Sequence, residues 1–275
     1  MRMTTVLSLS SLTLAVALLG GCTVTVKTQT KFVSSVPSTK TAAADYNGEN
    51  IDVTNGNGEL TIETDSSATK VSVSMVPFAF ADEDKKSDAE KVQQQIVDAF
   101  SLSEGGGQIT IKCNKASHGE GTAASGTSGC DKMVVKIPAN KPVKITALAD
   151  NGQLTVKGLT VADGAIANLK SDNGGVDATV TGGVNLECGN GDMKASLTPT
   201  KGSEVKLTTE NGDIDLALPK DFAADAIAFS AGKGVTVEGF SDLKDTSVSR
   251  GEKGAGAKSI RVEASDLGTL KVTAR

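Results

Sequence analysis

Two kinds of side chain in this sequence could support catalysis or metal binding: a single histidine, and carboxylates beside predicted turns. His118 is the only histidine. A Ser/His/Asp or Cys/His arrangement would have to use this one imidazole as its base, and a zinc site with two histidines cannot be built. We therefore expect no enzymatic activity, no metal and no cofactor.

The carboxylates beside the turns form three pairs, which are Asp172 with Asp177, Glu187 with Asp192, and Asp213 with Asp215. If neighbouring strands stack, such pairs could bind Ca²⁺ or cleave glycosides, and they resemble the Asp clusters of parallel β-helix enzymes that act on acidic polysaccharides. The alternative, which we favour, is that they keep exposed strand faces soluble and sheet edges unpaired. Aromatic residues are 3% of the chain and Trp is absent, so a sugar-stacking cleft is hard to build.

The cysteines have different predicted roles. Cys113 and Cys130 flank residues 114–129, a Gly- and Ser-rich segment without core-forming side chains, which we interpret as a loop insertion. In an oxidising compartment a disulfide that closes a loop of about 15 residues stabilises a fold by about 3 kcal/mol. We therefore predict a Cys113–Cys130 bridge. Cys188 is expected to be a small buried residue rather than a reactive thiol.

The N-terminus indicates the compartment. After Arg2, the chain is mostly apolar from Val6 to Leu19, as in a signal peptide. This run is interrupted by Ser and Thr and is too short for a membrane span of about 20 apolar residues. We interpret residues 1–21 as a signal peptide.

The string LLGGC, which ends at Cys22, resembles the lipobox of bacterial lipoproteins. The resemblance implies that Cys22 becomes the new N-terminus and carries diacylglycerol, usually with a further acyl chain such as palmitate. Two or more acyl chains hold a protein stably on a membrane. Thr23 stands where aspartate would indicate retention in the inner membrane, which points to the outer membrane. We expect a lipid-anchored protein of the cell envelope.

The charge balance argues against nucleic acid as a partner. The chain has 33 acidic residues against 28 Lys and Arg, a formal net charge of −5. Its mature part would keep only three arginines, Arg250, Arg261 and Arg275, so few side chains could bind phosphate in a bidentate way. The membrane is the expected partner through the lipid, with an envelope protein or polysaccharide as a further candidate.

Residues 22–44 are rich in Thr, Ser, Lys and Ala. We interpret them as the lipidated N-terminus and a flexible tether. In the alternative, residues 31–36 add an edge strand to the domain. The domain itself is predicted to cover residues 45–275.

A repeat dominates this domain. Asn-Gly pairs lie between stretches of alternating apolar residues, and the first begins at Asn57. The later pairs begin at Asn151, Asn173, Asn190 and Asn211. From Asn151 on, the intervals are 17 to 22 residues, and Lys233-Gly234 continues the series. Alternation with period two predicts strands with one buried face. Asn-Gly is also the strongest short signal for a hairpin, so an antiparallel meander is the alternative. The even spacing favours an all-β fold of the β-solenoid type, in which stacked strand repeats bury one another.

One helix is predicted at about residues 83–101. Its apolar residues, from Ala89 to Phe100, fall on one stripe. Ser87 and Glu90 have the spacing of a capping box, and Gly105 to Gly107 are expected to end the element. The helix is expected to lie against the sheet or close one end of the stack, with a partner-binding helix as the alternative.

The order of motifs resembles a known family. NGELTIET and VSVSMV, a charged helix, ITIKC and MVVKIP precede DNGQLTVKG, CGNGDMKASL and ENGDIDLALP. This resembles the bacterial β-strand-repeat family named putative adhesin, a domain of unknown function, and covers about residues 46–214. The resemblance implies an all-β repeat fold in exported or envelope-associated proteins and supplies no functional residues. We therefore expect a non-enzymatic, membrane-anchored binding or scaffolding module, with the Ca²⁺-binding or polysaccharide-active protein as the alternative.

Overall fold

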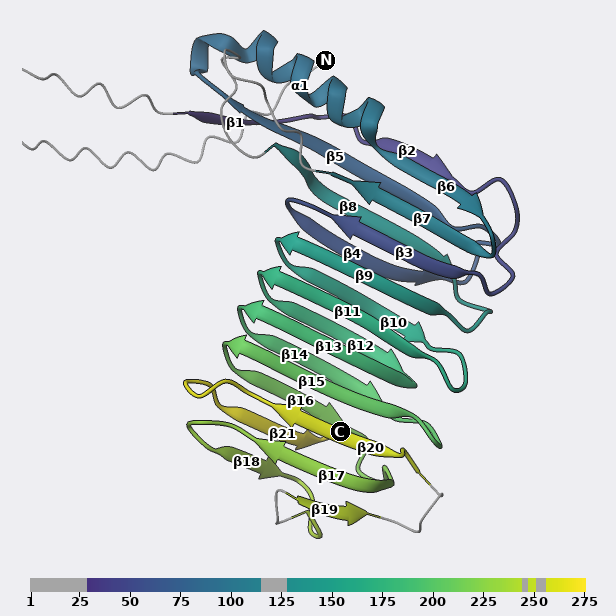
Figure 1. Ribbon diagram of the computed structural model, residues 1–275, viewed down its shortest axis with the longest axis vertical. Coiled ribbons are helices and arrows are strands. Elements are labelled where there is room, and N and C mark those ends of the chain that lie inside the picture. The colour runs from purple at the N-terminus through teal and green to yellow at the C-terminus, as the bar shows by residue number, and fades with distance from the viewer. Residues whose placement is uncertain (1–28, 115–127, 244–246, 251–255) are drawn as a thin grey trace, which may run out of the picture.

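The computed structural model describes residues 29–114, 128–243, 247–250 and 256–275, and consists of two large mixed β-sheets and one α-helix (Figure 1). In spatial order, sheet A contains β1 (Thr30–Val33), β5 (Ser72–Ala81), β8 (Gly129–Pro138), β4 (Glu59–Asp65), β10 (Leu154–Thr160), β12 (Val176–Thr181), β14 (Met193–Thr198), β16 (Ile214–Leu218), β21 (Leu270–Ala274) and β18 (Val235–Glu238), with β2 (Ser38–Thr41) also on β5. Sheet B contains β19 (Ser247–Arg250), β17 (Ala224–Ser230), β20 (Ser259–Glu263), β15 (Glu204–Asn211), β13 (Gly183–Asn190), β11 (Ile166–Asn173), β9 (Lys144–Asn151), β3 (Asn50–Asn55), β7 (Gln108–Cys113) and β6 (Ser101–Gly105).

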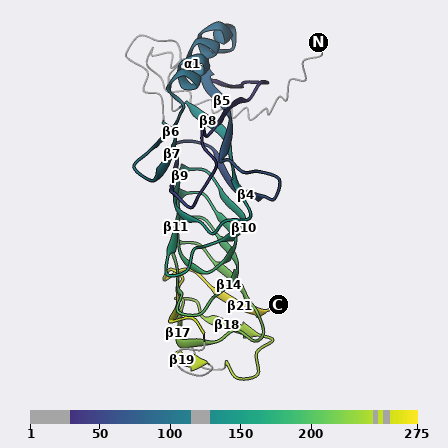
Figure 2. The same cartoon turned by 90° about the vertical axis from the view of Figure 1, so that its right-hand side faces the viewer.

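The core lies between the two sheets, which Figure 2 shows edge-on. Alternate residues of each strand point inward, as the period of two requires. In β12, for example, Val176, Ala178 and Val180 are buried while Asp177 and Thr179 are exposed. The apolar positions found in the sequence therefore form one continuous core.

The Asn-Gly turns join the two sheets. We call a strand of sheet B, the turn after it and the following strand of sheet A a rung. The rungs β9–β10, β11–β12, β13–β14 and β15–β16 stack in parallel register, so that Leu169 of β11 pairs with Leu186 of β13 and Val176 of β12 with Met193 of β14. Because each turn connects strands of different sheets, these turns do not form the antiparallel hairpins of the alternative interpretation.

The helix α1 (Lys86–Ala99) covers the N-terminal end of the stack (Figure 1). It packs on β5, with Ala89, Val92 and Ile96 buried. The amide of Gln93 donates a hydrogen bond of 2.8 Å to the carbonyl of Phe32 in β1. The apolar stripe thus faces the sheet, which was the preferred interpretation. No helix in the described part of the chain is both long and apolar enough to cross a bilayer.

Two details of the predicted helix were wrong. Its first three residues, Glu83–Lys85, form a 3₁₀ turn, and no side chain caps α1, whose N-cap residue is Lys85. Ser87 therefore lies inside the helix, and the capping box does not form. The glycines after the helix do not end it, because β6 intervenes and Gly106 and Gly107 form the turn of the β6–β7 hairpin.

Part of the predicted tether is folded. Residues 30–33 and 38–41, assigned mainly to a flexible tether, form β1 and β2, and both pair antiparallel with β5. Pairing satisfies backbone groups along the edge of sheet A, and Ala42 just after β2 is buried. The edge-strand alternative, which was made for residues 31–36, is therefore right for residues 31–33, and β2 was not predicted. Residues 1–28, with the predicted signal peptide and Cys22, lie outside the described part.

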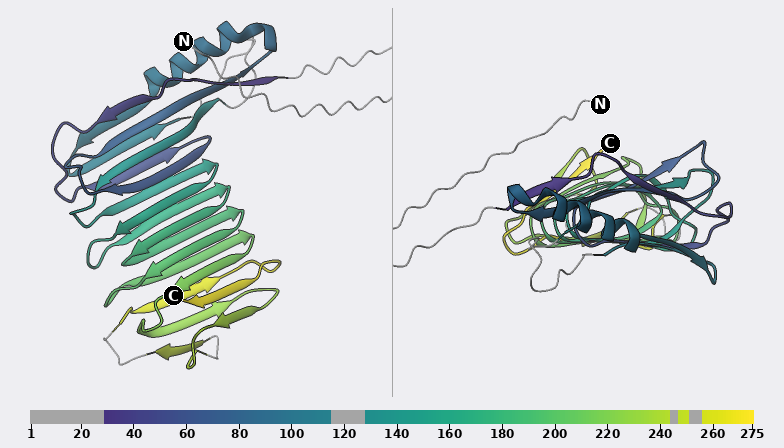
Figure 3. Two further views of the ribbon diagram at one scale, coloured as in Figure 1. Left: turned by 180° about the vertical axis from the view of Figure 1, so that it is seen from behind. Right: turned by 90° about the horizontal axis from the view of Figure 1, so that it is seen from above.

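The C-terminal end departs from chain order. The last rung, β20–β21, lies between β15–β16 and β17–β18, so that β20 pairs with β15 and β17, and β21 with β16 and β18, all in parallel. This order is visible from both sides of the molecule (Figures 1 and 3). The chain therefore passes the position of this rung once, forms another rung, and then returns to fill it.

Candidate functional site

The predicted disulfide is present. Cys113 at the end of β7 and Cys130 in β8 are bonded, both are buried, and their Cα atoms are 6.2 Å apart. Because β7 belongs to sheet B and β8 to sheet A, the bridge joins the two sheets near the N-terminal end. Residues 115–127 of the predicted insertion, including His118, lie outside the described residues.

Cys188 is the free cysteine of the described chain, and it is buried. Its Sγ donates to the carbonyl oxygens of Gly174 at 3.0 Å and Gly191 at 3.2 Å. Burial, and secondly the negative charge of Asp192, raise the pKa of this thiol to about 11. A protonated, enclosed thiol is a poor nucleophile, in agreement with the structural role expected from the sequence.

The five asparagines of the Asn-Gly turns form one hydrogen-bonded row, which we call the asparagine ladder. The side-chain amide of Asn57 donates to the carbonyl of Ser128 at 3.3 Å, and each later amide donates to the side-chain oxygen of the asparagine one rung earlier in the stack. Asn151 donates to Asn57 at 2.9 Å, and Asn173 donates to Asn151 at 3.0 Å. Asn190 continues the row to Asn173 at 2.9 Å, and Asn211 continues it to Asn190 at 3.0 Å. The recurring asparagine therefore serves contacts between rungs as well as turn formation.

The glycines of the same turns allow the rungs to approach closely. Gly212 has a φ of +147°, and a Cβ there would lie 2.0 Å from the carbonyl oxygen of Gly191. At Gly152 the corresponding distance, to the oxygen of Gly58, is 2.1 Å. No side chain fits at these positions, because rungs in a sheet stack at about 4.8 Å.

Small polar side chains support the turns from inside, and the sequence analysis missed them. They occupy the inward position two residues before a ladder asparagine. Ser171 donates to the carbonyls of Gly152 at 2.9 Å and Gly174 at 3.0 Å, and Thr209 donates to Gly212 at 3.1 Å. Cys188 occupies the same position in its rung. The sequence did contain a signal for them, because Ser171 and Thr209 are polar residues in strands whose other inward side chains are aliphatic.

The turn carboxylates bind backbone groups. Asp192 accepts the backbone N–H of Asp213 at 3.0 Å, and Asp213 accepts that of Thr269 at 2.7 Å. The N–H and hydroxyl groups of Thr269 lower the pKa of Asp213. Each carboxylate thus satisfies a donor of the neighbouring rung at the corner of the stack.

The other predicted carboxylates lie beside donors of their own strand or of neighbouring strands, and Glu187 accepts the side-chain amide of Asn185 at 3.0 Å. Asp215 lies on the outer face of sheet A in register with Lys194 and Lys271 on its two neighbours. The carboxylate of Asp172 lies 2.8 Å from the ammonium of Lys170. In the ranges that the structure describes, no three His, Cys, Asp or Glu side chains meet in a way that could hold a metal ion. The predicted carboxylate pairs are therefore not brought together as one site.

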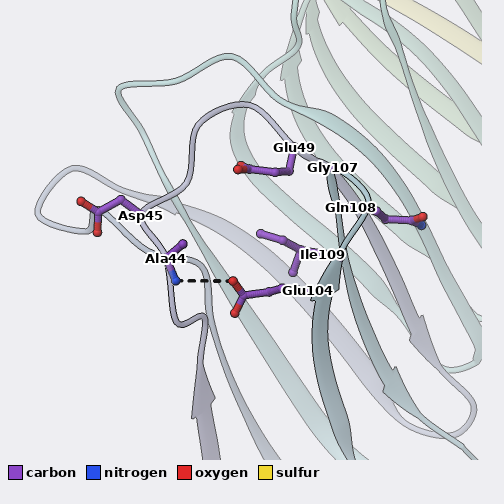
Figure 4. Close-up of a pocket in the computed structure, with 8 residues that line it drawn as sticks. Ala44, Asp45, Glu49, Glu104, Gly107, Gln108 and Ile109 are labelled. Atoms are coloured by element: carbon purple, nitrogen blue, oxygen red, sulfur yellow. Dashed lines mark hydrogen bonds between the residues drawn. The ribbon is translucent and has the colours of Figure 1, made fainter.

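A small pocket near the N-terminal end is lined by three acidic residues (Figure 4). It has a volume of about 150 Å³. The carboxylate of Glu104 accepts the backbone N–H of Ala43 at 2.6 Å and of Ala44 at 3.4 Å. Glu49 accepts the N–H of Asn47 at 2.7 Å, and Asp45 accepts the hydroxyl of Thr69 at 3.1 Å. These carboxylates hold the segment between β2 and β3 in place.

A wider hollow lies on the outer face of sheet B and has a volume of about 460 Å³. We call it the sheet B depression, and its polar lining residues are Asn50, Asp52, Gln108, Lys144, Thr146 and Asn168. Ile166 contributes an apolar side chain that is 39% exposed. The depression thus presents amide, hydroxyl, carboxylate and ammonium groups from four neighbouring strands. Such groups can form directed hydrogen bonds with a polar ligand.

No family model and no curated protein matches the chain. Among solved structures, one described as a putative cell adhesion protein from Clostridium sporogenes has 11% identity and a TM-score of 0.41, covering 87% of this chain and 100% of that chain. A putative adhesin from Bacteroides fragilis has 13% identity and a TM-score of 0.38, covering 87% and 98%. A putative lipid binding protein from Parabacteroides distasonis has 10% identity and a TM-score of 0.25, covering 86% and 97%. The chain is thus similar, at low identity, to proteins described in these terms.

Proposed function

We propose that this chain is a non-enzymatic lipoprotein of the bacterial cell envelope, anchored in the outer membrane, which binds surface molecules. Acyl chains on Cys22 hold it to the membrane, and the stacked rungs, which we class as a β-solenoid, hold its binding surfaces away from that membrane. The observation that supports the proposal is that the first described strand, β1, lies at one end of the stack beside α1 (Figure 1).

The described chain begins at one end of the stack, a short distance in sequence after Cys22. Six residues lie between Cys22 and Gln29, the first described residue, and the stretch from Cys22 to Gln29 can span at most about 25 Å. β1 and α1 lie at that end of the molecule, while β17, β18 and β19 lie at the other (Figure 1). A lipidated Cys22 would therefore keep the N-terminal end near the bilayer and direct the C-terminal rungs outward.

The sheet B depression supports binding. It is open and shallow, and its mixed polar lining suits a hydrated polysaccharide or a polar protein surface more than an enclosed apolar ligand. The Ca²⁺-binding or polysaccharide-cleaving alternative lacks comparable support, because Asp192 and Asp213 bind backbone N–H groups of the next rung. We therefore propose that the protein binds its ligand without catalysing a reaction.

Membrane fractionation tests the anchor. The native chain is expected in the membrane fraction, and Cys22→Ser is expected in the soluble fraction. Cys188→Ser, which changes a buried thiol that has no part in anchoring, is the matched control and should stay with the membrane. Sedimentation of Cys22→Ser with membranes in the same proportion as the native chain would contradict lipid anchoring.

A second experiment tests the binding surface. Envelope polysaccharide and envelope protein fractions are passed over immobilised chain, and retention is compared with that of Lys144→Glu. Lys194→Glu makes the same charge change on the outer face of sheet A and is the control. We expect Lys144→Glu to reduce retention at least tenfold and Lys194→Glu to leave it unchanged. Equal retention by all three chains would exclude the depression as the binding surface.

A further inference from the structure

We propose that the ligand of the sheet B depression is an acidic polysaccharide, a sugar polymer with carboxylates on its repeating units, and that this polymer lies along the stack on the outer face of sheet B. The inference names the ligand class of the binding role proposed above and rests on that role. It also extends the site beyond the depression, over Asn185 of β13 to Lys206 of β15 and Arg261 of β20.

One row of outward side chains connects the depression with these strands. We call it the polar row, and its members, in register from β3 to β20, are Asp52, Thr146, Asn168, Asn185, Lys206 and Arg261. They alternate along their strands with buried residues such as Val53 and Leu169, and so face away from the core. The row crosses the strands and advances by about 4.8 Å at each one. Its direction suits an extended polymer rather than a compact molecule.

The polar side chains of the depression are not used within the protein. In the described part of the chain, none of the six forms a hydrogen bond or an ion pair through its side chain. The acidic pocket near β2 differs, because Glu104 and Glu49 accept backbone N–H groups there. Unused donors and acceptors on a surface are hydrated, and ligand hydroxyl groups can replace the water. The depression is therefore equipped to bind a ligand rich in hydroxyl groups.

The cations of this face determine the charge of the ligand. Lys144 is exposed and lies opposite the neutral Asn50 in the register of sheet B. Lys206 lies opposite Arg261, and like charges in this arrangement repel each other. Arg261 is offset by Glu263, whose carboxylate accepts from its Nε at 2.8 Å. Lys144 and Lys206 thus have no anionic partner in the described chain, and a ligand carboxylate can fill that role.

The outer face of sheet A lacks this arrangement. Its outward residues Asp177, Lys194, Asp215 and Lys271 follow one another in register and alternate in sign. Opposite charges on neighbouring strands attract each other and largely cancel. An anionic polymer is therefore attracted to the outer face of sheet B in preference to that of sheet A.

The row favours a carboxylate over a phosphate. Phosphate groups are often held by the two parallel N–H groups of an arginine. The arginine of the row, Arg261, already donates from Nε and from one Nη to Glu263. The ammonium groups of Lys144 and Lys206 act as point charges and need no such fork. They can therefore hold the carboxylates of a polymer.

The row also favours a sugar polymer over an acidic peptide. Peptides are commonly bound at a free strand edge or in apolar pockets, whereas the backbone of β3, β9 and β11 is already paired on both sides. The one carboxylate of the polar row, Asp52, repels acidic side chains but accepts hydroxyl groups. A polysaccharide has hydroxyl groups on every unit, and an acidic peptide does not.

Lys144 and Lys206 lie far enough apart to bind different units of one polymer. β9 and β15 are separated by three strand spacings in sheet B (Figure 1), which is about 14 Å. Between them, Thr146, Asn168 and Asn185 offer hydroxyl and amide groups. A long polymer can contact both lysines and the groups between them, whereas a short fragment reaches only part of the site.

Oligogalacturonates of two and eight units test the inference. The full chain is extracted from membranes in detergent, and the affinity for each oligomer is measured by calorimetry. Lys144→Gln and Lys206→Gln each remove one charge from the site. Lys194→Gln removes the same charge from the outer face of sheet A and is the matched control. All three lysines are exposed, and equal melting temperatures will show that the variants are folded.

We expect the octamer to bind at least tenfold more tightly than the dimer. Lys144→Gln and Lys206→Gln should each weaken its binding at least fivefold, and Lys194→Gln should leave it unchanged. The methyl ester of the octamer keeps the hydroxyl groups but loses the charge, and it should bind the native chain at least tenfold more weakly. Equal binding of the octamer and its ester, equal binding of octaglutamate, or an unchanged affinity of Lys206→Gln would overturn the inference.

The result is separable from the test of the proposed function. If envelope fractions are retained through Lys144 but the octamer does not bind, the depression is a binding surface and the acidic polysaccharide is the wrong ligand class. If neither the envelope fractions nor the octamer are retained, both proposals fail.

Discussion

The close approach of the turns predicts a large effect of one methyl group at Gly212. In Gly212→Ala the new Cβ would lie 2.0 Å from the oxygen of Gly191 and 2.6 Å from its carbonyl carbon, at a φ of +147°. The backbone conformation costs a non-glycine residue about 1 to 3 kcal/mol. Forcing neighbouring backbone apart costs about 1 to 3 kcal/mol more. We expect a loss of about 2 to 6 kcal/mol, a large share of the stability of a domain.

Gly202→Ala is the matched control. Gly202 also has a positive φ, of +74°, but no atom lies within 4 Å of the position of its Cβ. It should lose only the conformational part, about 1 to 2 kcal/mol, and both variants gain the same small stabilisation from a stiffer unfolded chain. Urea unfolding followed by circular dichroism compares the two midpoints. If Gly212→Ala unfolds at the same urea concentration as Gly202→Ala, the stacking argument is wrong.

Three further predictions concern the turns. Asn173→Ala removes two bonds of the asparagine ladder and should lower the free energy of unfolding by about 1 to 2 kcal/mol in urea; a change below about 0.3 kcal/mol would mean that the ladder is not stabilising. The pKa of Asp213 is lowered by the Thr269 N–H and hydroxyl, so its contribution is present above the ordinary value of 3.8 and is lost as the pH falls below it. The stability difference between the native chain and Asp213→Asn should therefore shrink as the pH falls below the ordinary value of 3.8, and a constant difference would contradict the assignment. Cys188, with a pKa of about 11, should resist iodoacetamide at pH 8 until the protein is unfolded, and mass spectrometry of the native protein should find it unmodified.

The strands and their inward faces could be predicted because apolar residues alternate with a period of two. The spacing of the Asn-Gly pairs also indicated stacking, since the turns at Asn173, Asn190 and Asn211 hold equivalent places in successive rungs. The Cys113–Cys130 disulfide followed from the composition of the segment between the two cysteines. These features depend on local pattern, which a single sequence contains.

Other features depend on which strands meet. The order of the last three rungs was not predictable, because Ile227 and Ile260 offer nearly the same inward surface to Val205. The sequence spacing even favoured Lys233-Gly234 as the next turn after Asn211-Gly212. β1 was underestimated because its four residues alternate weakly and gain their stability from pairing with β5.

In the candidate site, too, local sequence patterns predicted some features, whereas others depend on which strands meet. The sequence identified Asp192 and Asp213 as turn carboxylates, but their role could not be predicted, because it depends on the backbone N–H groups of Asp213 and Thr269 in the next rung. The sheet B depression could not be found in advance. Its side chains come from β3, β7, β9 and β11, which are far apart in sequence and adjacent only in the sheet.

The proposed function depends most on acylation of Cys22, and the mass of the mature N-terminal peptide tests it directly. The native chain is extracted from membranes, digested and analysed by mass spectrometry. We predict a peptide that begins at Cys22 and carries the added mass of diacylglycerol and a further acyl chain. A mature peptide that begins elsewhere, or one that begins at Cys22 with an unmodified thiol, would contradict the anchored lipoprotein.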